Sequence, residues 1–141
     1  MTLTGSIQTP AETPAGWPVG LITGGTVMDL EAFELVILRV PADPPEWDDV
    51  DGERLQREHL AYLAAQREAG RAVGAGPLRE QADQSMRGLV FYRTGSLEEA
   101  RRISLDDPMV RAGHLEPDVM TWLCPPGTMS QPGRAVHIPD R

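Results

Sequence analysis

Apolar residues along the chain gather into short runs separated by polar segments. Four of these runs are bounded by proline, glycine or polar residues, as is typical of β-strands. They cover residues 33–40, 71–78, 86–94 and 115–123. Pro117 lacks a backbone N–H, so it favours an edge position or a bulge for the last of these strands.

Two stretches between the predicted strands have helical character. Residues 54–69 are strong helix formers and are followed by Gly70, which predicts a helix with a glycine at its C-terminal cap. Ser96 is followed three residues later by Glu99, a capping box that predicts a short helix through about Leu105. Residues 41–52 are acidic and rich in proline, which predicts a loop.

The resulting order of elements, β-α-β-β-α-β, predicts an α+β protein of the ferredoxin-like class. In this fold an antiparallel four-stranded sheet carries two helices on one face. The opposite face of the sheet then needs a partner, and a second copy of the chain is the simplest one. We therefore expect a homodimer.

Prolines are concentrated near the two ends of the chain. Seven of the 13 lie in residues 1–31 and 125–141, which predicts an N-terminal arm, a folded domain over residues 32–124 and a C-terminal tail. The arm also contains apolar residues that could pack against a folded domain, so ordered and disordered arms both stay open. These residues are Trp17, Leu21, Ile22, Val27 and Met28.

Composition and charge exclude several classes of function. A net charge of −8 and a pI near 4.8 argue against nucleic acid or an anionic membrane as the main partner. The sequence has no run of about 18 apolar residues, so we expect no membrane span, and the N-terminus does not resemble a secretory signal. A single cysteine, Cys124, fits a reducing cytoplasm. All 13 basic residues are arginine, which excludes lysine Schiff-base chemistry and a P-loop lysine.

Four segments of the chain together resemble the YCII-related (YciI-like) family of dimeric α/β-barrel proteins. They are REHLAYL at 57–63, AGPL at 75–78, SLEEA at 96–100 and DDPMVRAG at 106–113. The resemblance extends over residues 33–123 and implies that His59 and Asp107 form an active-site pair. Some relatives are implicated in dehydrochlorination of chlorinated hydroquinones, and related barrels include muconolactone isomerases and small-molecule monooxygenases. The resemblance therefore implies proton transfer on a small aromatic or enolisable compound without a cofactor.

The residues themselves allow this site and also a plainer interpretation. His59 shares a helical stripe with Leu55 and Leu63 that faces the sheet, whereas Arg57 faces water. A buried histidine bonded only to backbone is the alternative for His59. Asp107 precedes a proline at a helix start and is explained as an N-cap, although its second oxygen could orient His59.

The predicted helix starts place His59 and Asp107 at different distances along their helices. His59 would lie about 8 Å into its helix, and Asp107 would follow about 15 Å of the second helix. Only a tilt between the helices would then bring the two side chains together.

Other candidate residues are weaker. His114 is a second candidate histidine, and Tyr92 and Trp122 could line a site for a flat aromatic ligand, although strand aromatics more often belong to the core. Histidines 59, 114 and 137 lack metal-ligand spacing, the acidic residues 48, 49 and 51 are interpreted as a solvated loop, and Gly24–Gly25 is not a dinucleotide motif. Cys124 has no neighbour in sequence that would activate its thiol, so we interpret it as inert.

These observations favour a small cytoplasmic enzyme without a cofactor or metal. We expect it to act as an isomerase or lyase on a small-molecule substrate, with His59 and Asp107 as catalytic residues and Tyr92, His114 and Trp122 as substrate contacts. The alternatives are a non-catalytic metabolite-binding module of the same fold and a cofactor-free monooxygenase or cyclase. A solvent-reachable pocket shared by His59 and Asp107 would favour an enzyme, whereas a sealed, fully packed His59 would favour the binding module or a purely structural role.

Overall fold

The computed structural model describes residues 6–7, 23–24 and 28–138 of the 141-residue chain. The chain divides into two compact units. The larger unit is Phe33–Trp122, and the smaller one combines Met1–Ala32 with Leu123–Arg141. We describe each unit by itself.

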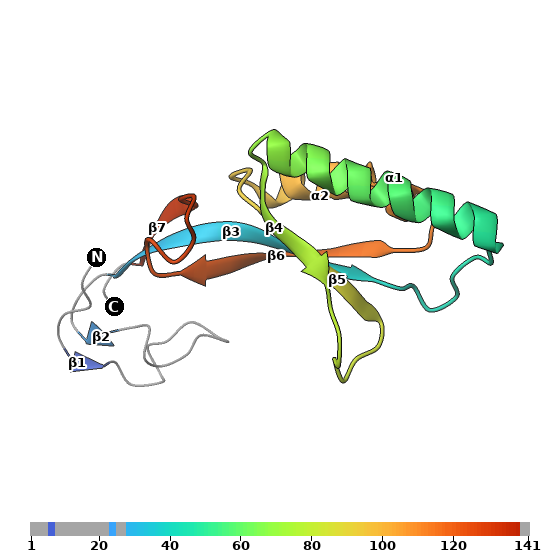
Figure 1. Ribbon diagram of the computed structural model, residues 1–141. Helices are drawn as coiled ribbons and strands as arrows, with labels where there is room; N and C mark the ends of the chain where they lie inside the picture. The colour runs from blue at the N-terminus through green and yellow to red at the C-terminus, as the bar shows by residue number, and fades with distance from the viewer. Residues whose placement is uncertain (1–5, 8–22, 25–27, 139–141) are drawn as a thin grey trace. The chain divides into compact units, whose positions relative to one another are not determined.

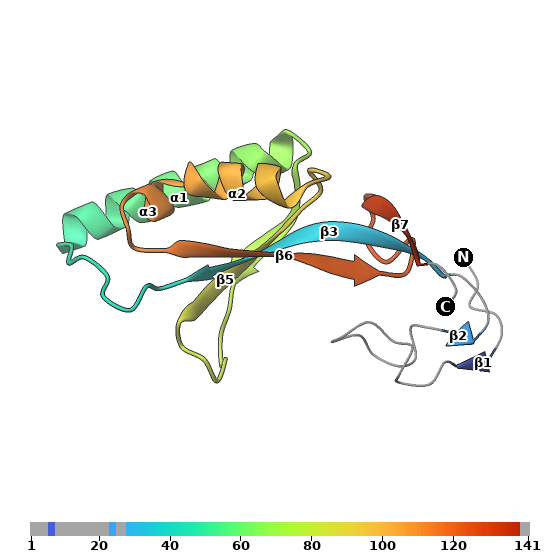
Figure 2. The same cartoon turned by 180° about the vertical axis from the view of Figure 1, so that it is seen from behind.

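The larger unit has the ferredoxin-like arrangement that the sequence predicted. Its strands follow the order β4-β5-β3-β6, and β5 pairs antiparallel with both β3 and β4. Figures 1 and 2 show all three helices on the same face of this sheet. The elements are β3 (Met28–Arg39), α1 (Asp49–Glu68), β4 (Ala72–Pro77), β5 (Met86–Tyr92), α2 (Leu97–Leu105), α3 (Pro108–Arg111) and β6 (Glu116–Cys124).

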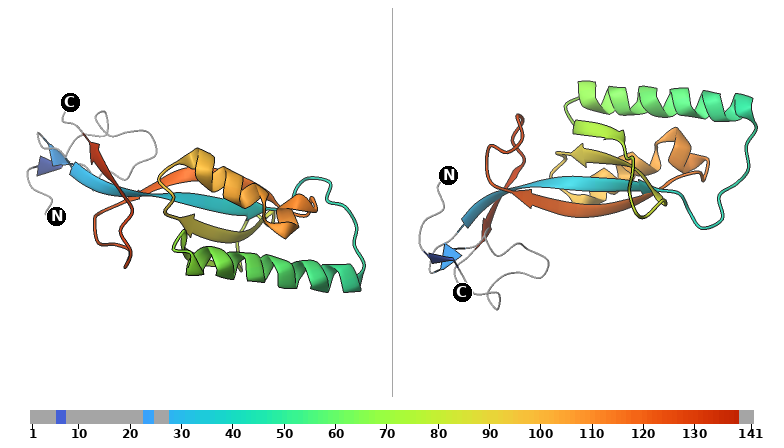
Figure 3. Two further views of the ribbon diagram at one scale, coloured as in Figure 1. Left: turned by 90° about the horizontal axis from the view of Figure 1, so that it is seen from above. Right: turned by 60° about the horizontal axis from the view of Figure 1, so that its bottom comes forward.

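Helices α1 and α2 lie over the sheet and run roughly along its strands, as the view from above shows (Figure 3, left). In that view α1 covers the β4 edge, and β6 stands last in the strand order at the opposite edge. The edge position of β6 confirms what Pro117 predicted, because proline is tolerated where no neighbouring strand needs its N–H.

The start of α1 differs from the prediction. The helix begins at Asp49, five residues before the expected Arg54, because the side chain of Asp48 caps it by accepting the Asp51 N–H at 2.8 Å. The first turn holds Asp49 and Asp51, whose negative charge suits the positive end of the helix dipole. These acidic residues are exposed, as predicted, but the interpretation of Asp49 and Asp51 as part of a loop was wrong.

The other predicted helix ends are confirmed. Gly70 follows α1 with a φ of 79°, the left-handed conformation in which glycine has no steric penalty. Ser96 caps α2, since its side chain accepts the Glu99 N–H at 3.1 Å.

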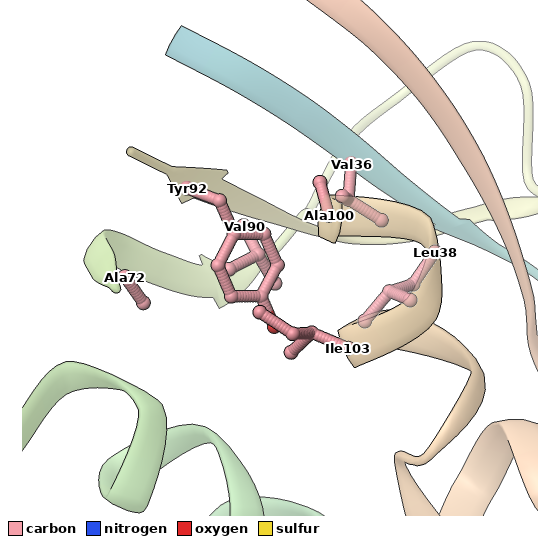
Figure 4. Close-up of a cluster of buried hydrophobic side chains, with 7 residues drawn as sticks. All are labelled: Val36, Leu38, Ala72, Val90, Tyr92, Ala100 and Ile103. Atoms are coloured by element: carbon pink, nitrogen blue, oxygen red, sulfur yellow. The ribbon is translucent and has the colours of Figure 1, made fainter. Parts of the chain in front are cut away.

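A hydrophobic core fills the space between α2 and the sheet (Figure 4). It takes alternate residues of the central strands, as expected for side chains that point to one face of a sheet. Its buried members are Val36, Leu38, Ala72, Val90, Tyr92, Ala100 and Ile103. Tyr62 and Leu63 of α1 are partly buried against this cluster.

A buried carboxylate holds the turn that connects β5 to α2. Oε1 of Glu34 accepts hydrogen bonds from Thr94 N–H at 2.7 Å, Thr94 Oγ1 at 2.7 Å and Gly95 N–H at 3.0 Å. Gly95 has a φ of 92° in this turn. Glu34 thereby fixes the point from which α2 starts.

The intervening strand positions carry aromatic rings. Trp122 contacts Phe33 with ring centroids 5.9 Å apart and Phe91 with centroids 5.1 Å apart. Because Phe33 and Phe91 alternate with the core residues of β3 and β5, this aromatic cluster belongs to the sheet face that is turned away from the helices.

The smaller unit contains a strand that the sequence analysis did not predict. β7 (Arg134–Ile138) pairs antiparallel with Met28–Ala32 of β3, and β1 (Ser6–Ile7) pairs with β2 (Thr23–Gly24). The buried side chain of Glu31 accepts hydrogen bonds from the N–H groups of Gly127 at 2.8 Å and Gly133 at 2.9 Å. Glu31 therefore holds both ends of the connection that leads to β7.

Two further expectations concern these end segments. Trp17, Leu21, Ile22, Val27 and Gly25 lie outside the described residues, so the packing of the arm stays a prediction, as do the domain boundaries at residues 31 and 124. Within the described part of the chain, no helix has the length and apolar character needed to cross a membrane.

Candidate active site

His59 and Asp107 are in direct contact. His59 Nδ1 lies 2.7 Å from Asp107 Oδ2 and 2.9 Å from Oδ1. An ionised carboxylate can only accept hydrogen bonds, so in this pair Nδ1 carries a hydrogen and donates it to Asp107. This contact selects the imidazole tautomer that leaves Nε2 free to accept a proton.

The early start of α1 explains why the two residues meet. His59 lies ten residues beyond Asp49 at the start of α1, and Asp107 lies ten residues beyond Leu97 at the start of α2. The depth difference expected from the sequence was wrong, because it rested on a helix start five residues too late. With the Asp48 cap included, His59 lies about 15 Å along α1, a depth that matches the end of the nine-residue α2, which Asp107 follows after a single cap residue.

Asp107 also performs the capping role that the sequence predicted. Its Oδ1 accepts the Met109 N–H at 2.9 Å and so caps α3. The residue is 2% exposed. One buried carboxylate thus holds both the start of a helix and the orientation of an imidazole.

His59 lies at the wall of a cavity. Nε2 has no hydrogen-bond partner among the described residues, and the His59 side chain is 12% exposed. The residue lines a cavity of about 760 Å³, whereas Asp107 is not among the lining residues. The imidazole is therefore reachable from the cavity, and the carboxylate stands behind it.

One stripe of α1 forms a wall of this cavity. Its members recur at the spacing of three and four residues that places side chains on one face of a helix. They are Gln56, His59, Leu60, Leu63, Ala64 and Arg67. The stripe is largely apolar around the imidazole.

The cavity exists because β4 supplies almost no side chains to fill it. The β4 residues that line it are Ala72, Gly74, Ala75, Gly76 and Pro77. A Cβ atom added to Gly74 or Gly76 would meet nothing within 4 Å. The space between α1 and β4 is thus left open by the small residues of the strand.

A loop before α1 forms another part of the wall. The ring of Trp47 stacks on His114 with centroids 4.0 Å apart and an interplanar angle of 29°. The Trp47 indole also lies against Gly52, because a Cβ atom added to Gly52 would be 3.4 Å from the indole ring. In the same loop, Pro45 lies against Gly113. These contacts hold an aromatic wall at the cavity beside the start of α1.

The structure brings only part of the predicted site together. His59 and His114 line the cavity. Tyr92 instead lies in the hydrophobic core, where burial raises the pKa of its phenol, and Trp122 belongs to the aromatic cluster on the opposite face of the sheet. The tryptophan at the cavity is Trp47, which the sequence analysis missed because it lies in a segment interpreted as an acidic loop.

Other reactive side chains stand apart from this site. His137 contacts Asp29 at 2.6 Å, but both side chains are exposed and belong to the smaller unit. Burial raises the pKa of the Cys124 thiol, which agrees with its interpretation as inert. In the described ranges no group of three His, Cys, Asp or Glu residues is arranged to hold a metal ion.

Comparisons with known proteins identify a family. The model of the YCII-related domain matches residues 38–123. No curated protein matches the sequence. Among solved structures, the chain is similar to the 5-chloro-2-hydroxyhydroquinone dehydrochlorinase of Burkholderia phenoliruptrix AC1100, in complex with 2,5-dihydroxybenzoquinone. The identity is 17%, the match covers 67% of this chain and 95% of that chain, and the TM-score is 0.44.

Proposed function

Because the chain belongs to the YCII-related family, we propose that it is a lyase or isomerase acting by proton transfer on a small aromatic or enolisable compound. One observation carries the proposal. His59 is held by a buried carboxylate through Nδ1, its Nε2 has no hydrogen-bond partner within the described residues, and the residue lines a cavity of about 760 Å³. A histidine oriented in this way is suited to general acid–base catalysis near neutral pH.

In the proposed reaction, Nε2 of His59 removes a proton from a substrate carbon next to a carbonyl group. The electron pair of the C–H bond moves into the carbonyl system and forms an enolate. Asp107 stabilises the imidazolium that results, because its carboxylate remains hydrogen-bonded to Nδ1.

The second step determines the reaction class. In a lyase, the enolate electrons form a carbon–carbon double bond, and a leaving group such as chloride departs with its electron pair from the neighbouring carbon. In an isomerase, the imidazolium returns its proton to a different carbon of the same enolate. Both outcomes balance without an oxidant, a reductant or a cofactor.

The same proposal includes a homodimer in the cytoplasm. Phe91 and Trp122, both partly exposed, lie with the buried Phe33 on the sheet face without helices, and a second copy would cover them. A single cysteine suits a reducing compartment.

The chain offers a matched control for testing the catalytic pair. His137 and Asp29 form a second histidine–aspartate contact, at 2.6 Å, on exposed side chains. We would incubate the wild type, His59→Gln and His137→Gln with chlorinated hydroquinones and with enolisable aryl ketones in D₂O. NMR would then record chloride elimination and deuterium incorporation.

We expect turnover of at least one compound class by the wild type and by His137→Gln. His59→Gln should lose about 10²–10⁴ of the rate, the usual contribution of a general acid–base residue. Equal rates for wild type and His59→Gln would overturn the assignment of His59. Saturable binding without any turnover would favour the metabolite-binding module.

A further inference from the structure

The charged groups around the cavity share one sign. Its charged lining residues are two arginines, Arg67 and Arg87. No Asp or Glu is among the lining residues in the part of the chain that the structure describes. This is unexpected for a protein with 21 acidic residues and a net charge of −8.

Arg67 belongs to the α1 stripe that forms a wall of the cavity. It lies eight residues beyond His59, about 12 Å along the helix axis. Helical side chains lean toward the N-terminus of their helix, so the Arg67 stem is directed back toward His59. A long arginine side chain can cover much of that separation.

Arg87 reaches the cavity through an irregularity of the sheet. Leu38 pairs with Gly88 and Arg39 pairs with Met86, so Arg87 is an extra residue with no partner on β3. Such a β-bulge changes the direction of a side chain relative to regular strand alternation. The Arg87 backbone stays fixed, because its carbonyl accepts the Leu78 N–H at 2.9 Å.

Both guanidinium groups are available for a ligand. Neither Arg67 nor Arg87 forms an ion pair with any residue of the described ranges, whereas Arg39, Arg54 and Arg102 each pair with carboxylates. A guanidinium is a planar fork of donors that matches a carboxylate. Trp47, stacked on His114, adds an aromatic surface to the same cavity.

From these observations we infer that the cavity binds an aromatic carboxylate, with Arg67 and Arg87 as its cationic contacts. The inference rests on the proposed function, since it names the substrate class of the same site. The carboxylate is the binding handle of the substrate, and the ring presents the reacting carbon to His59.

Binding of a matched pair of probes tests the inference. 4-Hydroxybenzoate and 4-hydroxybenzamide have the same ring and phenol and differ in the charge of one substituent. Their dissociation constants for the full chain would be measured by calorimetry or ligand-observed NMR, at low salt and at 0.5 M NaCl. We expect the carboxylate to bind about fivefold more tightly or better at low salt, and the preference to shrink at high salt.

The variants separate local contacts from net charge. The double variant Arg67→Gln with Arg87→Gln should lose the preference while its affinity for the amide is unchanged. The control is Arg57→Gln with Arg79→Gln, which changes the net charge equally at two exposed arginines that do not line the cavity. This control should keep the preference, and the two single cavity variants then show which guanidinium holds the carboxylate.

The inference would be overturned if the wild type bound neither probe or bound both equally well. It would also be overturned if the preference for the carboxylate survived in the cavity double variant. An equal loss of that preference in the Arg57→Gln, Arg79→Gln control would overturn it as well. The assay needs no turnover. Retained preference without any turnover would therefore refute the proposed function alone, and turnover without the preference would refute the inference alone.

Discussion

Replacing Asp107 distinguishes its helix cap from its contact with His59. The carboxylate accepts the Met109 N–H at 2.9 Å and lies 2.7 Å and 2.9 Å from His59 Nδ1. Asp107→Ala removes both acceptors. Asp107→Asn keeps an oxygen for the cap but replaces the other oxygen with an NH₂ group.

We expect the two variants to differ in thermal stability. In Asp107→Ala the loss of the cap costs about 1 kcal/mol. A buried His59 Nδ1–H left without an acceptor costs about 1–3 kcal/mol more. The sum, about 2–4 kcal/mol, lowers the melting temperature by roughly 6–12 °C for a chain of this length. Asparagine caps about as well as aspartate, so Asp107→Asn should lose only about 3 °C.

Activity should follow a different order. In Asp107→Asn the amide NH₂ donates to His59 Nδ1, which moves the imidazole hydrogen to Nε2. An Nε2 that already carries hydrogen cannot take a substrate proton, so we expect about 10³–10⁴ lower turnover despite near-normal stability. Asp107→Ala should lose both turnover and stability.

Circular dichroism melts and the D₂O exchange assay would be run together, with Asp106→Ala as an exposed neighbouring control. Two outcomes would contradict the reasoning. One is wild-type turnover by Asp107→Asn. The other is an Asp107→Ala variant that melts no earlier than Asp106→Ala.

Three further predictions concern the surrounding fold. Burial raises the pKa of both tyrosines, Tyr62 and Tyr92. Absorbance at 295 nm should therefore stay low through pH 10, and the free energy of unfolding should fall above that pH because the unfolded chain loses its phenol protons first. Glu34→Ala removes the acceptor of three hydrogen bonds and should cost about 3 kcal/mol in urea unfolding; a cost below about 1 kcal/mol would refute its role in the turn. Gly88→Ala places a Cβ 3.1 Å from a β4 carbonyl oxygen and should cost about 1–2 kcal/mol, whereas Gly74→Ala, which meets nothing within 4 Å, should melt like the wild type.

Local sequence rules were sufficient for most of the larger unit. Gly70, Ser96 and Pro117 each act through their own backbone or a near neighbour, so their effects could be read directly from the sequence. The order of the strands within the sheet followed from the β-α-β-β-α-β order of the elements along the chain. The start of α1 was placed too late because the cap at Asp48 stands in front of residues that look like an acidic loop.

Long-range features could not be read in the same way. β7 forms because its residues pair with β3, about a hundred positions earlier in the chain, and no local pattern encodes that pairing. The cavity is equally non-local, since it results from a lack of side chains on β4 opposite α1. Trp47 lies in a predicted loop, Arg67 in a predicted helix and Arg87 in a predicted strand, and no local pattern indicates that the fold brings them to one cavity.

The shared use of Asp107 has a consequence for how the site assembles. α3 has only four residues, too few for a helix to persist without its cap and its packing. Any event that opens this single turn also withdraws the carboxylate from His59. If the proposed function holds, activity therefore depends on the shortest helix of the described chain. Heating should then abolish activity through local opening of α3 before the sheet itself unfolds.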